Sequence, residues 1–238
     1  MNRVPRIFTH PLPPALTQTQ LEGDSAHYLL KVLRVKTHQK LELFDGAGQM
    51  LPCTVIQSDR RSLTIETQAI QAIDNQSPRH ITLCLALIKP ERFEWALQKA
   101  CELGVNAIQP IISERTDGRL ADKLDKKMPR WSSILQNAAE QSLRSHLPQL
   151  HAPVSLEHLI PHGQGIFLDP QAEQPLQATT RDIQLLIGPE GGWSQVEQDW
   201  ARAQNFTAAS LGPRILRAET AAITSLSLCQ YLSGDLAG

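Results

Sequence analysis

Several features that would place a protein in a broad class at once are scarce or missing in this sequence. Its four cysteines stand far apart and form no CxxC pair, and its eight histidines do not cluster at metal-ligand spacing. We therefore expect neither a disulfide framework nor a bound metal. No apolar run reaches about 18 residues, which argues against a transmembrane helix, and the N-terminus lacks the apolar core of a signal peptide. The expected location is the cytoplasm, with no membrane partner.

An excess of charge of one sign is also missing. The chain has 23 Lys and Arg against 24 Asp and Glu, a formal net charge of -1. Proteins that bind nucleic acid through bulk charge are strongly basic. Residues 1–72 hold eight basic against six acidic side chains, and residues 73–238 hold 15 against 18. Any RNA-binding surface should be a local patch in the N-terminal part, although this small imbalance fits ordinary surface charge equally well.

Three common glycine signatures are absent as well. The chain contains no GxGxxG, which excludes the usual dinucleotide fingerprint and the similar loop of Rossmann-type methyltransferases. It contains no GxxxxGK[ST] and no GxSxG. A P-loop nucleotidase and an α/β-hydrolase are therefore disfavoured.

The first 72 residues read as a β-rich domain. A short strand at Arg6–Phe8 and an Asp45-Gly46 turn between apolar segments indicate paired strands. Short strands with turns at this spacing are typical of a small barrel. Between them, a helix is expected through residues 27–34, with Asp24 or Ser25 as its N-cap. The polar stretch 74–78 is the expected linker.

Residues 73–238 alternate between strand and helix patterns, which predicts an α/β domain with a parallel sheet. Ser194 and Glu197 have capping-box spacing at the start of one helix. The expected strands are 81–88, 105–112, 165–168, 183–187 and 206–211, and the expected helices are 91–103, 124–144, a segment from Ser194, and 219–232.

Two strand-to-helix loops carry the residues that indicate chemistry. The first, IGPEGGWS at residues 187–194, follows a buried strand and opens the capped helix. Its glycines allow a ligand to approach the backbone closely. The second, LGPRILRAET at residues 211–220, also joins a strand to a helix. Such loops at the carboxyl ends of strands are where open α/β sheets bind ligands. A plain turn, and a merely solvated Arg217, are the competing interpretations.

With these two loops in place, the chain resembles the bacterial 16S ribosomal RNA (uracil-N3)-methyltransferases of the SPOUT superfamily. The motifs LLIGPEGGWS and LGPRILRAETAA carry the resemblance, and HYLLKVLR, ALQKACELGVNAIQPIISER and RWSSILQNAAEQSLRSHLPQL extend it over nearly the whole chain. One departure is Trp193, which stands where a smaller apolar residue would be expected.

The resemblance implies a fold and an activity that spacing alone did not show. It implies a PUA-like RNA-binding barrel at 1–72 and a SPOUT methyltransferase domain with a deep trefoil knot at 73–238. The implied cofactor is S-adenosylmethionine, and the implied partners are a second copy of the chain and the 16S rRNA of the small ribosomal subunit, modified near the decoding centre. The implied product is N3-methyluridine.

Site residues follow from the matching motifs. Uracil N3 must lose its proton before it can attack a methyl group, and charge then spreads onto the carbonyl oxygens. Glu190 and Arg217 are the candidates for the base and for the charge-stabilising donor, with helix capping, loop bracing and phosphate binding as alternatives. The expected RNA contacts, or contacts to a partner subunit's active site, are Arg6, Arg34, Arg115 and Arg144. The expected cofactor contacts are Leu168, Ile187, Gly188, Pro189, Gly191, Gly192, Leu211, Gly212, Ile215, Leu216 and Thr220.

Two competing functions stay open. A related SPOUT enzyme could methylate a ribose 2′-oxygen or a tRNA guanine. A non-catalytic RNA-binding or ribosome-assembly protein would fit the near-zero charge, although the intact glycine loops disfavour it.

Overall fold

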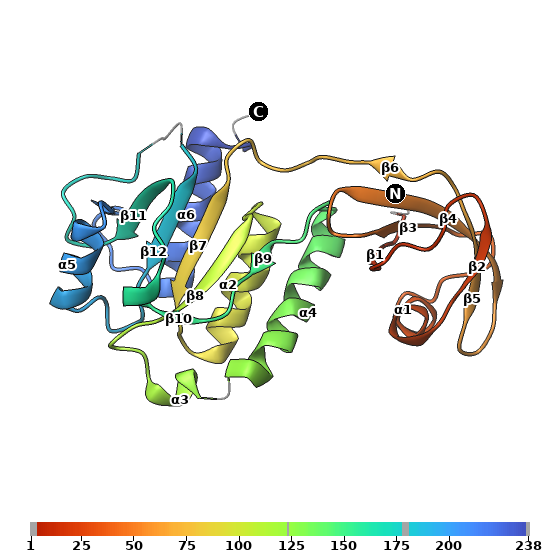
Figure 1. Cartoon of the computed structure of the whole chain (residues 1–238), viewed down its shortest axis with the longest axis horizontal. Coiled ribbons are helices and arrows are strands. Elements are labelled where there is room, and N and C mark those ends of the chain that lie inside the picture. Colours follow the sequence, from red (N-terminus) through yellow and green to blue (C-terminus); the bar gives the residue numbers. More distant parts are fainter. Residues whose placement is uncertain (1–3, 123, 178–180, 237–238) are drawn as a thin grey trace. The chain divides into compact units, whose positions relative to one another are not determined.

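The structure, a computed structural model, describes residues 4–122, 124–177 and 181–236. Its contacts divide the chain into two compact units (Figure 1). The first contains Met1–Gln76 together with Ala139–Leu147, and the second contains Ser77–Ala138 and Pro148–Gly238. The boundary therefore falls four residues beyond the expected position between 72 and 73, and residues 139–147 join a unit from which they are remote in sequence.

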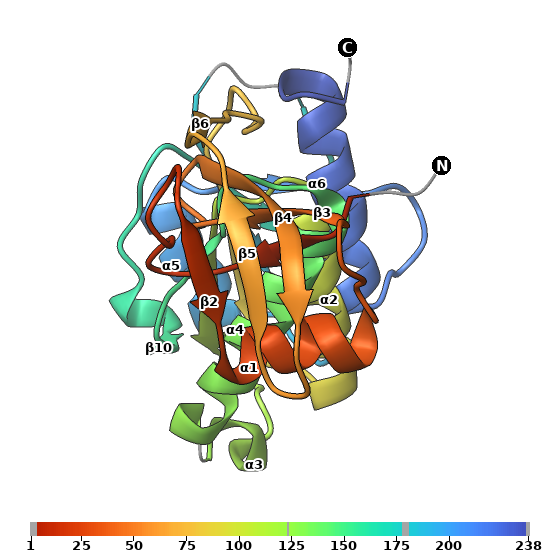
Figure 2. The ribbon, with the colours of Figure 1, turned by 90° about the vertical axis from the view of Figure 1, so that its right-hand side faces the viewer.

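The first unit is a curved sheet around its own apolar core. Its strands are β1 (Arg6–Phe8), β2 (Gln18–Leu21), β3 (Lys40–Phe44), β4 (Gln49–Ser58), β5 (Leu63–Thr67) and β6 (Gln71–Ala72). They are ordered β1-β3-β4-β5-β2, with β6 paired to β4. Figure 2 shows β2, β5 and β4 side by side, with α1 across one end. No described pair joins β1 to β2, so the predicted barrel is open along that seam.

The helix of the first unit differs from its expected form. Helix α1 spans Gly23–His27 and continues as a single π-helical turn over Tyr28–Val32. Its N-cap is Glu22, which makes no side-chain cap, so the capping by Asp24 or Ser25 expected from the sequence was wrong. Asp24 lies in the first turn instead, where a carboxylate favours the positive end of the helix dipole.

Hydrogen bonds explain why residues 139–147 belong to the first unit. The Glu140 carboxylate accepts from the N–H of Phe8 at 3.0 Å. The Leu143 carbonyl accepts from Arg6 Nη1 at 2.7 Å and from the Asn75 amide at 2.8 Å. Because each contact spans more than sixty residues, no local sequence pattern predicts it.

The second unit is built on an all-parallel sheet. Its strands are β7 (Ile81–Ala86), β8 (Ala107–Ile112), β9 (Gln149–Leu150), β10 (Val154–Ser155), β11 (Gln164–Leu168), β12 (Ile183–Ile187) and β13 (Thr207–Ala209). The order is β10-β8-β7-β12-β11-β13, with β9 paired to β8. Every residue of β7 and β12 is buried, as expected for central strands covered on both faces.

The helices of this unit are α2 (Pro90–Glu102), α3 (Gly118–Ala121), α4 (Leu124–Ser142, of which the residues from 139 on belong to the first unit), a 3-10 turn (Leu156–His158), α5 (Gln195–Ala203) and α6 (Ala218–Ser233). Helices α2, α4, α5 and α6 match the four expected helices to within two residues at each predicted end. Helices α2 and α6 pack against each other. The predicted capping box of α5 is present, because Ser194 accepts from the Glu197 N–H and the Glu197 carboxylate accepts from the Ser194 N–H.

The predicted α/β class with a parallel sheet is confirmed, together with a separate β-rich N-terminal unit. The short elements α3, β9 and β10 were not expected, since two to four residues are too few to show a period. The trefoil knot stays a prediction. Among the described residues, none of the helices combines the length and the apolar character that a membrane-spanning segment requires.

Candidate active site

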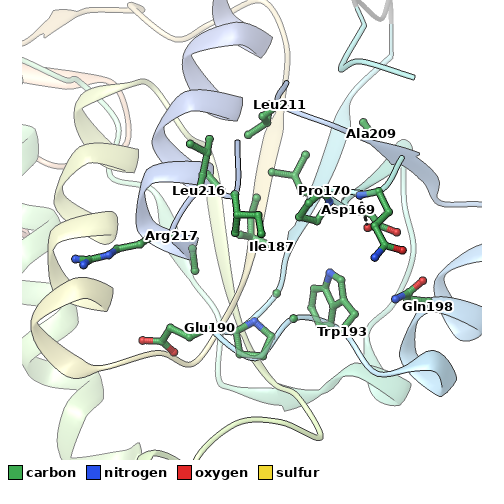
Figure 3. Close-up of a pocket in the computed structure, with 18 of the residues that line it drawn as sticks. Asp169, Pro170, Ile187, Glu190, Trp193, Gln198, Ala209, Leu211, Leu216 and Arg217 are labelled. Atoms are coloured by element: carbon green, nitrogen blue, oxygen red, sulfur yellow. Dashed lines mark hydrogen bonds between the residues drawn. The ribbon is translucent and has the colours of Figure 1, made fainter. Parts of the chain in front are cut away.

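A pocket of about 760 Å³ opens at one edge of the parallel sheet (Figure 3). Leu168, Ile187 and Ala209, the last residues of β11, β12 and β13, form its floor. Loops 168–171 and 187–193 and the segment 211–217 surround it. These three strands are neighbours, so their carboxyl ends meet at one place, which is the usual ligand position in open α/β sheets.

The pocket has an apolar middle and two different polar ends. Leu211, Leu216 and Ile187 face the middle in Figure 3. Asp169 and Gln198 lie on one side of them, and Glu190 and Arg217 on the other. A ligand with an apolar or aromatic centre and polar groups at both ends would match this division.

Glycine shapes the wall of the pocket at Gly188, Gly192 and Gly212. A Cβ atom on Gly188 would lie 3.0 to 3.2 Å from the ring atoms of Trp193, so only glycine leaves this indole in place. Gly192 and Gly212 have φ values of +69° and +91°, in the region that favours glycine. The two loops therefore bring bare backbone to the cavity.

The Glu190 carboxylate is held by an arginine of α2. Arg92 Nη1 lies 3.4 Å from Glu190 Oε1, and Arg92 Nε lies 3.6 Å from Glu219 Oε1. Glu190 remains about one-third exposed, whereas Glu219 is buried and its Oε2 contacts no hydrogen-bond donor among the described residues. One guanidinium thus sits between two carboxylates at the edge of the pocket.

Arg217 and Arg115 bring positive charge to the same pocket. Arg217 is the exposed N-cap of α6, and its side chain extends away from the apolar middle (Figure 3). Arg115 Nη1 donates to the Gly191 carbonyl at 2.7 Å, which ties the loop after β8 to the loop after β12. The rim therefore offers guanidinium groups near Glu190, as a polyanionic substrate would require.

The described side chains do not favour a cysteine nucleophile or a metal centre. Burial raises the pKa of the Cys53, Cys84 and Cys229 thiols to about 12, so they stay protonated and are poor nucleophiles. Within the described ranges, no three His, Cys, Asp or Glu side chains gather as a metal site would need.

Comparisons with known proteins decide the family. A model of the RNA methyltransferase domain matches residues 75–230, and a model of the RNA methyltransferase PUA domain matches residues 21–68. The chain belongs to the ribosomal RNA small subunit methyltransferase E family. It is 31% identical to the protein of that name from Buchnera aphidicola (Schizaphis graminum), with 98% of each chain covered, and 33% identical to the one from Synechocystis, with 89% and 71% covered.

Solved structures of relatives have the same fold. The methyltransferase E from Neisseria gonorrhoeae, bound to S-adenosyl methionine, is 30% identical with a TM-score of 0.89. A methyltransferase from Legionella pneumophila, in complex with the same cofactor, is 33% identical with a TM-score of 0.87. Each comparison covers 98% of this chain and 100% of the other. The SPOUT-type fold and the PUA-like N-terminal unit inferred from the resemblance are thereby confirmed.

Most of the cofactor contacts expected from the sequence line this pocket. They are Leu168, Ile187, Gly188, Pro189, Gly192, Leu211, Gly212, Ile215 and Leu216, and both Glu190 and Arg217 line it too. Gly191 and Thr220 do not. A Cβ on Gly191 would meet only Arg115, at an ordinary 3.5 Å. These two residues lie beside the cavity rather than on its wall.

The four arginines expected to contact RNA fall into two groups. Arg34 is exposed in the first unit, and Arg115 lines the pocket. Arg6 and Arg144 require a correction, because their side chains are buried. Arg6 is 8% exposed and bonds Glu42, Leu143 and the sulfur of Met50. A guanidinium held in this way stabilises the first unit and is not available to a phosphate.

Sequence reasoning missed several residues that line the pocket. Asp169, Pro170 and Gln171 follow β11, whose neighbours could not be known without the strand order. Gln195 and Gln198 lie on α5, and Ala218 and Ala221 lie on α6. Their sequence pattern predicted a helix but gave no indication of a pocket. The remaining unexpected residues are Trp193, Ala209 and Arg214. In the first unit, exposed Arg60 and Arg61 at the turn between β4 and β5 were also not singled out.

Proposed function

We propose that this protein transfers a methyl group from S-adenosylmethionine to N3 of one uridine of 16S rRNA, near the decoding centre of the small ribosomal subunit. It is an S-adenosylmethionine-dependent methyltransferase of small-subunit ribosomal RNA, and the uracil-N3 specificity is the proposal. The observation that supports this proposal is the pocket, an apolar cavity with glycine in its walls and with a carboxylate and a guanidinium at one end.

The residues of the pocket fit the proposed cofactor. Ile187, Leu211 and Leu216 offer apolar surface to a purine, and the bare backbone at Gly188, Gly192 and Gly212 allows close approach. Asp169 supplies an acceptor for hydroxyl or ammonium groups. When bound, S-adenosylmethionine supplies an electrophilic methyl group on a sulfonium.

The chain's own task is to position the base and manage its proton. Held in line with the methyl group, N3 gains the advantage of orientation that a site provides. Glu190, oriented by Arg92, accepts the N3 proton directly or through one water molecule. The N3 lone pair then forms the new N–C bond while the S–C electrons return to sulfur. Arg217 stabilises the charge that develops on the uracil oxygens.

One experiment separates this proposal from its competitors. Small subunits from a strain lacking N3-methyluridine are incubated with the purified protein and the cofactor, and the rRNA is then digested and its nucleosides identified by mass spectrometry. We expect N3-methyluridine in 16S rRNA. A 2′-O-methylated nucleoside or a methylated guanosine would assign a different SPOUT activity, and an unmodified RNA from a protein that binds the subunit would favour an assembly role.

A further inference from the structure

We propose that the indole N–H of Trp193 donates a hydrogen bond to the bound cofactor. This rests on the function proposed above, and it turns the one residue that departs from the expected motif into a determinant of cofactor affinity. The acceptor would be an oxygen or nitrogen of the cofactor's nucleoside or amino-acid part.

The first argument is that this donor has been taken out of water without a partner. Trp193 is 7% exposed, and its Nε1 atom is buried with no hydrogen-bond acceptor among the described residues. Indole nitrogen can only donate. A buried donor left unpaired costs free energy, and tryptophan N–H groups usually find a partner when they are buried.

The second argument is where the donor points. Trp193 lines the pocket, and Figure 3 shows the indole nitrogen on the ring edge that faces Pro170 and Asp169. The far end of the pocket, with Glu190 and Arg217, lies on the other side of Ile187. The N–H is therefore placed to meet a ligand away from the reacting end.

The third argument is that the direction of the donor is fixed before any ligand arrives. The ring packs against Gly188, where an added Cβ would approach Nε1 to 3.1 Å and Cε2 to 3.0 Å. The next residue, Ser194, is the N-cap of α5 and accepts a hydrogen bond from the Glu197 N–H, which fixes the backbone beside Trp193. A donor held in place by its surroundings loses little conformational freedom on binding, so the bond contributes fully to affinity.

Asp169 completes the complementary arrangement. Its carboxylate is half-buried in the same end of the pocket, and its Oδ1 accepts from the Gln171 N–H at 2.9 Å. One fixed acceptor and one fixed donor suit a group that offers both functions. A ribose with its hydroxyls and an α-amino acid each do so.

The decisive variant is Trp193→Phe, which keeps most of the ring and removes the N–H. We expect the Kd of S-adenosylhomocysteine, measured by calorimetry, to rise about 3- to 10-fold, the effect of losing one hydrogen bond in a buried site. The matched control is Trp131→Phe, since Trp131 is also buried but packs on Phe93 at a centroid distance of 4.6 Å outside the pocket. Its Kd should equal that of the wild type.

The Tm of the ligand-free protein distinguishes a cofactor-binding role of Trp193 from a purely structural one, because the two roles predict opposite changes of Tm in Trp193→Phe. If Nε1 has no partner in the free protein, Trp193→Phe should keep or raise the Tm, because an unpaired buried donor has been replaced by carbon. The rise in Tm that ligand produces should shrink. A lower Tm without ligand and an unchanged Kd would overturn the proposal and assign Trp193 to packing alone.

The location of the acceptor follows from a second ligand. 5′-Methylthioadenosine lacks the amino-acid part, so an equal loss of affinity for both ligands would place the acceptor on the nucleoside, and a loss for S-adenosylhomocysteine alone would place it on the amino acid. Either result supports the proposal. Wild-type protein that binds neither ligand would overturn the cofactor assignment itself, whereas wild-type binding that Trp193→Phe leaves unchanged would overturn only the inference about Trp193.

Discussion

At the residue scale, the proposed roles of Glu190 and Arg217 at the edge of the pocket require different properties. A base must be ionised and close to N3, whereas a charge-stabilising donor must meet the uracil oxygens only as the reaction proceeds. Glu190 is already engaged by Arg92, and Arg217 stands exposed at the start of α6. The two roles can therefore be tested by separating turnover from binding.

Removal of Arg217 should slow the chemistry and spare the cofactor. We expect Arg217→Ala to lower the single-turnover rate at saturating RNA and cofactor by about 10² to 10³, as for the loss of one oxyanion donor. Cofactor affinity should change little, since a sulfonium gains nothing from a nearby cation. Arg217→Lys should restore only part of the rate, because an ammonium lacks the planar fork. A normal rate with weakened RNA affinity would instead assign Arg217 to phosphate binding.

Gly188 should be the most sensitive glycine of the first loop. A methyl group there would press on the Trp193 ring, whose nearest atom is 3.0 Å away, and would shift the pocket wall. We expect Gly188→Ala to weaken cofactor binding at least tenfold by calorimetry. Gly191→Ala is the matched control, since its Cβ makes only ordinary 3.5 Å contacts with Arg115 and lies off the lining. Equal losses in both variants would contradict this distinction.

Glu140 should make stability depend on pH. Burial raises the pKa of this carboxyl group, and the hydrogen bond from the Phe8 N–H opposes the rise. The folded protein therefore keeps the proton to a higher pH than the unfolded chain, so stability falls as pH rises through the unfolded and then the folded pKa. Glu140→Gln keeps an acceptor without the charge. Its Tm relative to the wild type should increase as the pH rises above about 4.3, the pKa of an unperturbed glutamic acid. A constant difference would rule this cause out.

At the element scale, the two glycine-containing loops of the site could be predicted from the sequence, whereas the segments that lie beside them could not. The segments 187–194 and 211–220 were found because glycine, proline and charge follow a strand within a few residues. Asp169 and Gln198 were not found, because their role depends on β11 lying between β12 and β13. Strand order is a property of pairing over long distances, and the burial of Arg6 and Arg144 depends on the same kind of contact.

Helix α6 links the pocket to a surface that a second copy of the chain could cover. Its first residues reach the pocket, and its last turn exposes Tyr231 and Leu232 to 61% and 40%. We expect a dimer by light scattering, and Tyr231→Glu together with Leu232→Glu should shift it toward monomer, because charge is costly in an apolar interface. Val196→Glu on α5, at an exposed apolar residue, should not. A fully active wild-type monomer would exclude an interface that completes the site.

At the scale of the whole molecule, near-zero net charge limits how RNA can be held. Binding should rest on a few phosphate contacts, and each contact should contribute about 0.9 to the slope of log affinity against log salt for duplex, or about 0.7 for single strands. Arg34→Ala should reduce that slope by about one contact with an unchanged Tm. Arg6→Ala should instead lower the Tm, because it leaves Glu42 without its partner. The reverse pattern would restore Arg6 as an RNA contact.

The pairing of β12 with β7 also has a consequence for synthesis. These central neighbours are about a hundred residues apart in sequence, and the first unit itself includes residues 139–147. While the chain is emerging from the ribosome, the first unit cannot be completed before residues 139–147 have been made, and the pocket cannot be completed before loop 211–217. Nascent chains truncated before α6 should therefore remain protease-sensitive and unable to retain the cofactor, so that this methyltransferase becomes competent only after α6 has been synthesised.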